Sequence, residues 1–168
     1  MLKKKNTYEK HKVTFTVEAA LKEFSDVVYR VAYSHTKHEA DANDVYQDVF
    51  MRFMKYGIGK EFDSLEHARH WFIRVTLNVY HTSISKAKRR VEIEQGSIHL
   101  EEETREYSEV TSAVQELEEK YRIVLHLFYY EGYKIKEIAA ILDENESTIK
   151  TRLSRAKKQL KQNLEMGR

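Results

Sequence analysis

Apolar residues in the N-terminal half of the chain recur with the spacing of amphipathic helices. Thr16 is a suitable N-cap, and the apolar positions that follow it lie three or four residues apart: Val17, Leu21, Phe24, Val27, Val28 and Val31. The same pattern predicts a second helix from about Ala40 to Tyr56, with Gly57 and Gly59 at its end. Ser64 is the expected N-cap of a third helix, with three residues on its buried face: Phe72, Val75 and Val79.

The C-terminal part of the chain continues the helical pattern in three segments. One helix is predicted near Val110–Tyr130, and a short one at about Lys134–Leu142. Asp143–Asn145 is expected to form a turn, with Asn145 as the N-cap of a last helix from Glu146 to about Leu164. The core positions of that helix are Ile149, Leu153, Ala156 and Leu160.

An acidic stretch separates the two patterned parts. Residues 91–109 contain seven glutamates against one arginine, and large apolar residues are few. This composition is typical of a flexible linker, although parts of it could be helical. We therefore expect an all-α protein of two small helical domains, residues 16–90 and 110–164, joined by a linker at 91–109.

Composition agrees with helices and excludes several kinds of site. The 168 residues include no proline and only five glycines, whereas strand-and-turn folds need many such residues. Cysteine is absent, which excludes disulfides, thiolate zinc sites and cysteine nucleophiles. No apolar run approaches the roughly 18 residues of a membrane span, and Met1–Lys12 is unlike a secretory signal. We expect a cytoplasmic protein with no membrane insertion.

Charge is distributed unevenly along the chain. The formal net charge is only +2, yet basic residues gather at 86–90 and again from residue 150 onward. Each block could attract a polyanion such as nucleic acid.

The last two predicted helices have the pattern of a helix-turn-helix, in which a short helix and a turn precede a longer basic helix. Such a unit places its second helix in the major groove of DNA. The residues predicted to face DNA are Ser147, Thr148, Lys150, Thr151, Arg152, Ser154, Arg155 and Lys158. An ordinary solvated basic face is the alternative interpretation.

The sequence of this part resembles a known family. Glu137–Leu142, followed by Thr148–Leu160, is similar to the fourth conserved region of bacterial sigma factors, and Leu117–Gly132 is similar to the helix before it. The resemblance implies that this domain reads the −35 promoter element and docks on the flap of the polymerase β subunit.

The N-terminal domain resembles the same family. Ala40–Phe50 is similar to its polymerase-binding helix and Trp71–Asn78 to its −10-reading helix. The resemblance implies that one set of residues binds the β′ clamp of core RNA polymerase: Asp41, Asp44, Gln47 and Asp48. It implies that a second set binds the −10 element: Trp71, Arg74, Asn78, Lys86, Lys88, Arg89 and Arg90.

Two simpler interpretations of these residues stay open. Trp71 could belong to the core, and the aspartates could form a solvated acidic face. Because no further domain is evident, the chain is identified as a member of the smallest class of sigma factor, the extracytoplasmic-function type, and an anti-sigma factor is an expected partner.

Four positions depart from the family pattern. Thr82 stands where the family often has an acidic residue, and Glu118 replaces a proline. In the predicted turn, Asp143 and Glu144 replace a glycine and an apolar residue. We expect Glu144 to be exposed, because burying a carboxylate is costly.

Three other functions can be weighed against a sigma factor. A DNA-binding regulator that acts without polymerase would need a dimer interface or effector pocket, and the sequence indicates neither. A protein-interaction module that has lost promoter function is a second alternative. An enzyme is the least favoured, since the sequence has no glycine-rich phosphate loop, nucleophile with its base, or metal site, and His67 and His70 have no third ligand. No cofactor is expected.

Overall fold

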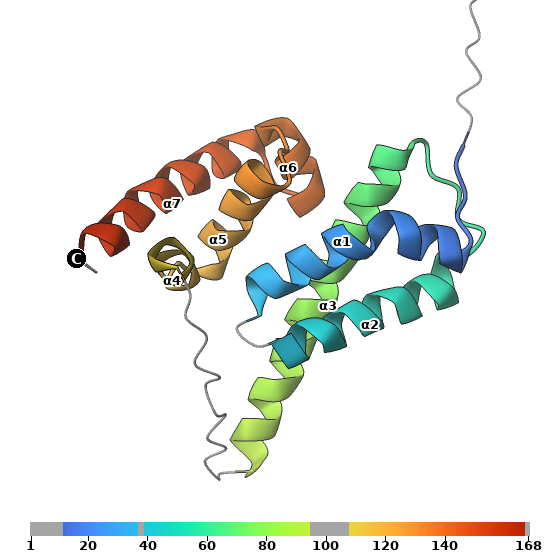
Figure 1. The fold of residues 1–168 in the computed structure, drawn as a ribbon, viewed down its shortest axis with the longest axis horizontal. Coiled ribbons are helices and arrows are strands. Elements are labelled where there is room, and N and C mark those ends of the chain that lie inside the picture. The colour runs from blue at the N-terminus through green and yellow to red at the C-terminus, as the bar shows by residue number, and fades with distance from the viewer. Residues whose placement is uncertain (1–11, 37–38, 95–107, 167–168) are drawn as a thin grey trace, which may run out of the picture.

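The structure is a computed structural model that describes residues 12–36, 39–94 and 108–166, except for the side chains of 84–94. Seven α-helices and one short π-helix make up the described part, with a single isolated β-bridge between Val13 and Phe62. Figure 1 shows α1, α2 and α3 as one group of helices and α4 to α7 as another beside it. The fold is therefore all-α.

The first group is built on three long helices: α1 (Val17–His35), α2 (Glu39–Tyr56) and α3 (Leu65–Glu94). Their core is aromatic, and the rings of Phe24 and Phe72 stack with centroids 4.4 Å apart, while Phe53 lies 5.2 Å from Phe72. All three rings are fully buried. Burial of such large side chains is the main stabilisation of a small helical unit.

The predicted caps of α1 and α3 are confirmed. The Thr16 hydroxyl accepts a hydrogen bond from the backbone N–H of Ala19 at 3.2 Å, and the Ser64 hydroxyl accepts one from His67 N–H at 3.0 Å. Each bond satisfies one of the N–H groups that a helix leaves unpaired at its start.

The predicted end of α2 at Gly57 has a steric cause. A Cβ at this position would lie 2.2 Å from the ring of Phe53. Only glycine fits there, because the ring fills the space that any side chain would need. The turn thus brings Phe62 back into the core, where its backbone pairs with Val13 through two hydrogen bonds of 2.8 and 2.9 Å.

The second group contains α4 (Glu109–Gln115), α5 (Glu119–Leu125), the π-helix η1 (His126–Tyr130), α6 (Ile135–Leu142) and α7 (Glu146–Met166). The prediction of one helix over Val110–Tyr130 was wrong, since the segment breaks between α4 and α5 and widens into η1. The break is stabilised by Arg122, which is 7% exposed and donates to the carbonyls of Gln115 and Leu117 at 3.0 and 3.2 Å. The side chain therefore replaces hydrogen bonds that a continuous helix would have made.

The two groups of helices contact each other. α1 packs on α5, and α3 packs on α6. Buried apolar residues of both groups form one continuous cluster. α3 extends to Glu94, which is inside the predicted linker, while residues 95–107 of that linker lie outside the described residues. The domain boundaries stay predictions.

A buried histidine lies where the groups meet. His35 is 2% exposed, its ring is 5.2 Å from that of Tyr80, and neither ring nitrogen has a hydrogen-bond partner within the described residues. Burial lowers its pKa to about 3, with the positive charges of Arg122, His126 and His81 acting in the same direction. His35 is therefore neutral in the folded protein at pH 7.

This histidine predicts acid sensitivity. The unfolded chain takes up a proton at His35 below pH 6.5, whereas the folded protein does not until about pH 3. The free energy of unfolding should therefore fall as pH drops through this range, and His35 should account for about 2 kcal/mol between pH 7 and pH 5. Urea unfolding at the two pH values measures the loss.

His35→Phe keeps an aromatic ring beside Tyr80 and removes the titrating group. Between pH 7 and pH 5 its free energy of unfolding should fall by about 2 kcal/mol less than that of the wild type. Gln162→Ala, at an exposed position with no titrating group, should keep the wild-type dependence. Equal pH dependence in the wild type and His35→Phe would contradict the assignment.

Candidate nucleic-acid interface

A tight turn between α6 and α7 sets the geometry of the helix-turn-helix. Asp143 adopts the left-handed backbone conformation, with φ of 54°. This conformation ends a helix and favours glycine, the residue that the sigma-factor pattern has here. Glu144 N–H then donates to Ala139 O at 2.9 Å. The Asn145 side chain accepts from Thr148 N–H at 2.7 Å, which confirms it as the N-cap of α7.

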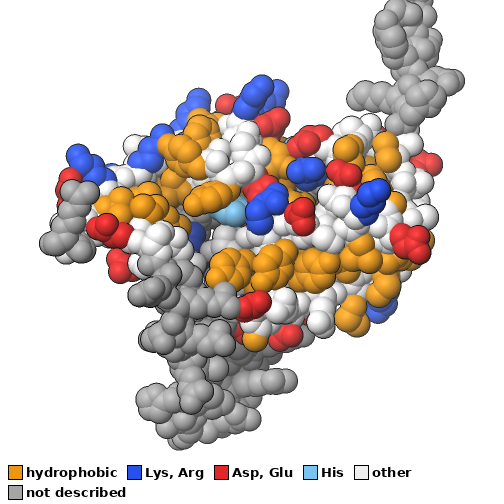
Figure 2. Space-filling view, viewed as in Figure 1, with side chains coloured by type: hydrophobic (Ala, Val, Ile, Leu, Met, Phe, Trp, Pro, Cys, Tyr) orange, Lys and Arg blue, Asp and Glu red, His pale blue; other side chains and the backbone are white. Residues whose placement is uncertain are grey.

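The two faces of α7 differ as the sequence pattern predicts. Ile149, Leu153 and Ala156 are buried against the other helices. Six of the predicted −35 residues are exposed, namely Ser147, Lys150, Thr151, Ser154, Arg155 and Lys158, while Thr148 and Arg152 are half-buried. Figure 2 shows Lys and Arg side chains along the outer edge of the molecule where α7 lies. The helix thus offers an accessible basic face.

Arg152, a half-buried basic residue of α7, has an acidic partner in the preceding turn. Its guanidinium donates to the Glu144 carboxylate at 2.6 Å, and the two side chains are 25% and 34% exposed. The expectation that Glu144 is simply exposed was therefore wrong. The ion pair explains how the chain tolerates a partly buried carboxylate at this position. It also occupies a residue predicted to read DNA.

A groove between α2 and α3 holds part of the predicted −10 set. It is lined by Asp48, Met51, Arg52, Lys55, Tyr56, Trp71, Val75 and Asn78. Trp71 is both a core and a groove residue, because it is half-buried and its ring lies edge-on to those of Phe72, Phe62 and Phe53 at 5.0, 5.8 and 6.1 Å. Trp71 thus belongs to the core, and its binding of the −10 element stays a prediction.

Sequence reasoning missed three residues of this groove. Arg52, Lys55 and Tyr56 come from the last turns of α2, and the Tyr56 side chain is 67% exposed. Their signal was available, since two cations and an aromatic residue interrupt the end of an amphipathic helix. An exposed aromatic beside cations is a suitable surface for stacking an unpaired base.

Arg74 points away from the groove. Its Nε donates to Ile141 O at 3.2 Å and its Nη2 to Ala140 O, both at the C-terminal end of α6. Of the predicted −10 residues on α3, Trp71 and Asn78 therefore line the groove and Arg74 does not. The four basic residues at 86–90 belong to α3, and their side chains lie outside the described residues.

The residues predicted to bind polymerase lie on α2. Asp41, Asp44, Gln47 and Asp48 are all exposed. Sequence reasoning missed a row of rings where α1 meets α2, formed by Tyr29, Tyr33 and Tyr46, with centroids 6.1 and 6.3 Å apart. Figure 2 shows hydrophobic side chains in a row over the face made by α1 and α2. The first group of helices thus carries an exposed acidic set and a separate aromatic row.

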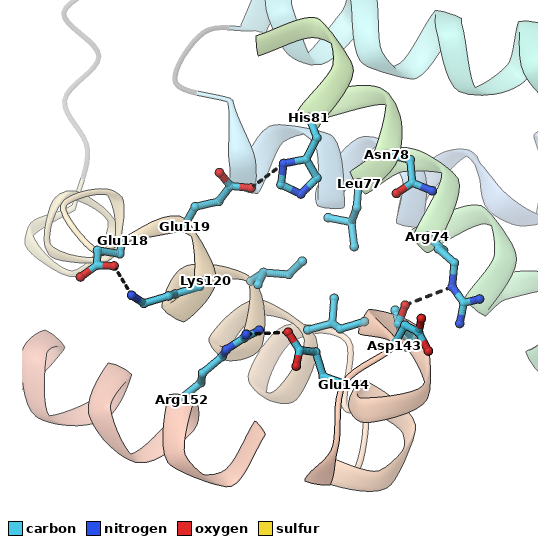
Figure 3. A pocket seen from close by; sticks show the side chains of 13 residues that line it. Arg74, Leu77, Asn78, His81, Glu118, Glu119, Lys120, Asp143, Glu144 and Arg152 are labelled. Atoms are coloured by element: carbon cyan, nitrogen blue, oxygen red, sulfur yellow. Dashed lines mark hydrogen bonds and ion pairs between the residues drawn. The ribbon is translucent and has the colours of Figure 1, made fainter. Parts of the chain in front are cut away.

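A cleft separates α3 from α5 and the α6–α7 turn. Figure 3 shows Arg74, Asn78 and His81 on one wall and Glu118, Glu119, Asp143 and Glu144 facing them, with Arg152 nearby. His81 Nδ1 lies 3.4 Å from Glu119, and Lys120 lies 2.6 Å from Glu118. Predicted DNA-binding residues from both groups of helices therefore line one cleft together with carboxylates.

The described residues lack two other kinds of feature. They hold no group of three or more His, Cys, Asp or Glu side chains placed to bind a metal ion, and His67 and His70 lie beside Asp63 and Glu66. None of their helices is long and apolar enough to cross a membrane.

Two family models match the chain. Residues 21–90 match the model described as Sigma-70 region 2, and residues 107–160 match the one described as Sigma-70, region 4. RNA polymerase sigma factor SigV of Bacillus subtilis is 29% identical over 140 residues, or 77% of this chain and 80% of that protein. ECF RNA polymerase sigma factor SigM of the same species is 28% identical over 157 residues, or 87% of this chain and 93% of that protein.

Two solved structures have a similar fold. The sigma factor RpoE of Bartonella quintana, crystallised with the anti-sigma factor NepR, superposes with a TM-score of 0.74 at 23% identity, over 90% of this chain and 98% of that one. CnrH, in complex with the cytosolic domain of CnrY, gives a TM-score of 0.64 at 21% identity, over 89% and 88%. These similarities show that the arrangement of helices is shared.

The N-cap of α7 predicts a measurable stability effect. Asn145→Ala removes the acceptor for Thr148 N–H and should lower the free energy of unfolding by about 1 kcal/mol. Asn145→Asp keeps an acceptor and should retain most of that stability. Gln162→Ala, at an exposed position of the same helix, is the matched control. Equal stability of Asn145→Ala and the control in urea unfolding would contradict the capping role.

Proposed function

The chain belongs to the sigma-70 family of bacterial RNA polymerase sigma factors, in its extracytoplasmic-function branch, and from this premise we propose how its helices share the work. It binds core RNA polymerase and directs promoter-specific initiation of transcription. The observation that carries this conclusion is the presence of both regions in one chain, in the family order.

The basic face of α7 reads the −35 element. Exposed residues near the start of the helix, Lys150 and Thr151, are placed to reach base edges, while Arg155 and Lys158 follow one and two turns later. An arginine can hold a guanine with two hydrogen bonds, and lysines contribute affinity through phosphates. The buried opposite face supports this role, since it fixes which side of the helix is free.

The groove between α2 and α3 holds the −10 strand. Trp71 and Tyr56 offer rings for stacking on unpaired bases, and Asn78 can read a base edge. Arg52 and Lys55, on the rim of the same groove, are suited to phosphates. Lys86, Lys88, Arg89 and Arg90, further along the sequence of α3, bind backbone phosphates of the −10 element. Arg74 joins them when released from α6.

The acidic face of α2 binds core polymerase. Asp41, Asp44, Gln47 and Asp48 contact the coiled coil of the β′ clamp, and the second group of helices docks on the β flap. Like charges at three- and four-residue spacing repel mildly on a free helix. A basic partner would relieve that repulsion, which is why this face suits an interface.

The setting follows from these roles. The chain works in the cytoplasm beside RNA polymerase and catalyses no reaction itself, because polymerase carries out the chemistry and the sigma factor supplies position. An anti-sigma factor restrains it. This partner is supported by the sigma factor RpoE of Bartonella quintana, which has a similar fold and was crystallised with the anti-sigma factor NepR.

Transcription of a genomic DNA library in vitro tests the function. The purified chain should add a defined set of initiation sites to core RNA polymerase of Bacillus subtilis, and these sites should share sequences near −35 and −10. Mapping the 5′ ends of the transcripts measures this. If the chain adds no promoter-specific starts, the proposal fails.

A single side chain tests the −35 assignment. Arg155→Ala should reduce initiation at a promoter found in that experiment by about tenfold to a hundredfold, because a lost base contact costs about 1–3 kcal/mol. Lys161→Ala removes a cation from the same helix beyond the predicted surface and should stay within about twofold of wild type. Equal losses for the two variants would indicate a general charge effect and overturn the assignment.

A further inference from the structure

An ion pair joins the two groups of helices. Arg30, on α1, donates from Nε and Nη2 to the two carboxylate oxygens of Glu131, at 2.9 and 3.0 Å. The residues are 101 positions apart in the sequence. A bidentate pair between arginine and carboxylate fixes both direction and distance, so it is among the strongest polar contacts a protein surface can make.

The acidic half of this pair is positioned by the π-helix. Glu131 N–H donates to His126 O at 3.1 Å, the wide hydrogen bond that defines η1, and the Glu131 side chain is turned inward to 3% exposure. Burial by itself would raise the pKa of Glu131, but the Arg30 guanidinium and the nearby His126 ring outweigh it and hold the pKa at about 2. Glu131 is thus a buried carboxylate between the Arg30 guanidinium and the His126 ring, whose Nε2 lies 3.3 Å away.

Two further arginines cross between the groups, each to the end of a helix. Arg74, on α3, donates to the last carbonyls of α6. Arg122, on α5, donates to His35 O at the last turn of α1, at 3.4 Å. Carbonyls at a helix C-terminus lack partners and carry partial negative charge, so a cation there is favourable. Each group therefore caps a helix of the other.

Three of the four departures from the family pattern line the cleft between α3 and the second group of helices. They are Glu118, Asp143 and Glu144, and they come from two separate parts of the chain. Glu144 pairs with Arg152, and the neighbouring Glu119 lies beside His81 of α3. A carboxylate thus already pairs with Arg152, a cation predicted to bind DNA.

We propose that the free protein masks its own DNA-binding residues. The Arg30–Glu131 pair holds the two groups of helices together on either side of the cleft. In this closed form Arg74 is bound by carbonyls of α6, and Arg152 is bound by the Glu144 carboxylate. The inference rests on the proposed function, because it takes these two arginines as DNA-binding residues. Promoter DNA and the closed cleft compete for the same side chains. The apparent affinity for DNA is then reduced by the fraction of molecules that are open.

Removal of Arg30 distinguishes masking by the closed cleft from a simple effect of charge on DNA binding. Arg30→Ala deletes a cation, which by electrostatics alone weakens DNA binding. If the pair closes the cleft, the same variant should instead bind a promoter fragment about tenfold more tightly without polymerase, because more molecules are open. The Arg30 side chain is 47% exposed, so its loss leaves the core intact.

Distance measurements test the closure directly. The chain has no cysteine, so Lys22→Cys and Lys136→Cys give one exposed spin label on α1 and one on α6. In the otherwise wild-type protein, double electron–electron resonance should give one narrow distance population. Arg30→Ala should broaden it toward longer distances, and Glu131→Gln should do the same from the other side of the pair.

Lys12→Ala is the matched control. It also removes one cation and one ion pair, the one between Lys12 and Glu61, but it leaves every contact between the two groups of helices in place. It should keep the narrow distance population and bind DNA no more tightly than wild type. The proposal is overturned if the wild type is already broad, if Arg30→Ala keeps the wild-type distances, or if its affinity rises no more than that of the control. The distances decide this even if the chain fails to direct transcription, which would count against the proposed function alone.

Discussion

Unpaired backbone carbonyls at the ends of helices determine much of how the helices of this structure are arranged. An α-helix leaves its last carbonyls without an internal partner, and a short all-α chain has many such ends to satisfy. Here arginine side chains from distant parts of the sequence supply donors. Arg122 serves the end of α4 and the last turn of α1, and Arg74 serves the end of α6. Polar satisfaction of helix ends, as well as the apolar core, thus decides which helices lie beside each other.

The sequence predicted the features that depend on local chemistry. The caps Thr16, Ser64 and Asn145 were predictable because capping needs only a short polar side chain before an amphipathic segment. The all-α fold and the buried face of α7 followed from periodicity in the same way.

The features that sequence reasoning missed depend on which polar groups meet. The break before α5 needs Arg122 to donate to the carbonyls of Gln115 and Leu117, and the apolar pattern does not predict these hydrogen bonds. The π-helix, the Glu144–Arg152 pair and the turning of Arg74 toward α6 are of the same kind. Apolar periodicity predicts none of them, because it indicates which face of a helix is buried and not which polar groups contact each other.

The five-residue π-helix has a consequence for how such a protein can change over generations. A π-turn holds one residue more than the α-helical turn it replaces. Loss of a single codon within 126–130 would therefore restore an ordinary helix without rotating the residues beyond it, because the π-turn absorbs the extra residue. The wide hydrogen bond from Glu131 N–H to His126 O would be lost, while Glu131 would stay close to Arg30. One insertion or deletion could thus be accommodated at this point without altering any residue predicted to touch the promoter.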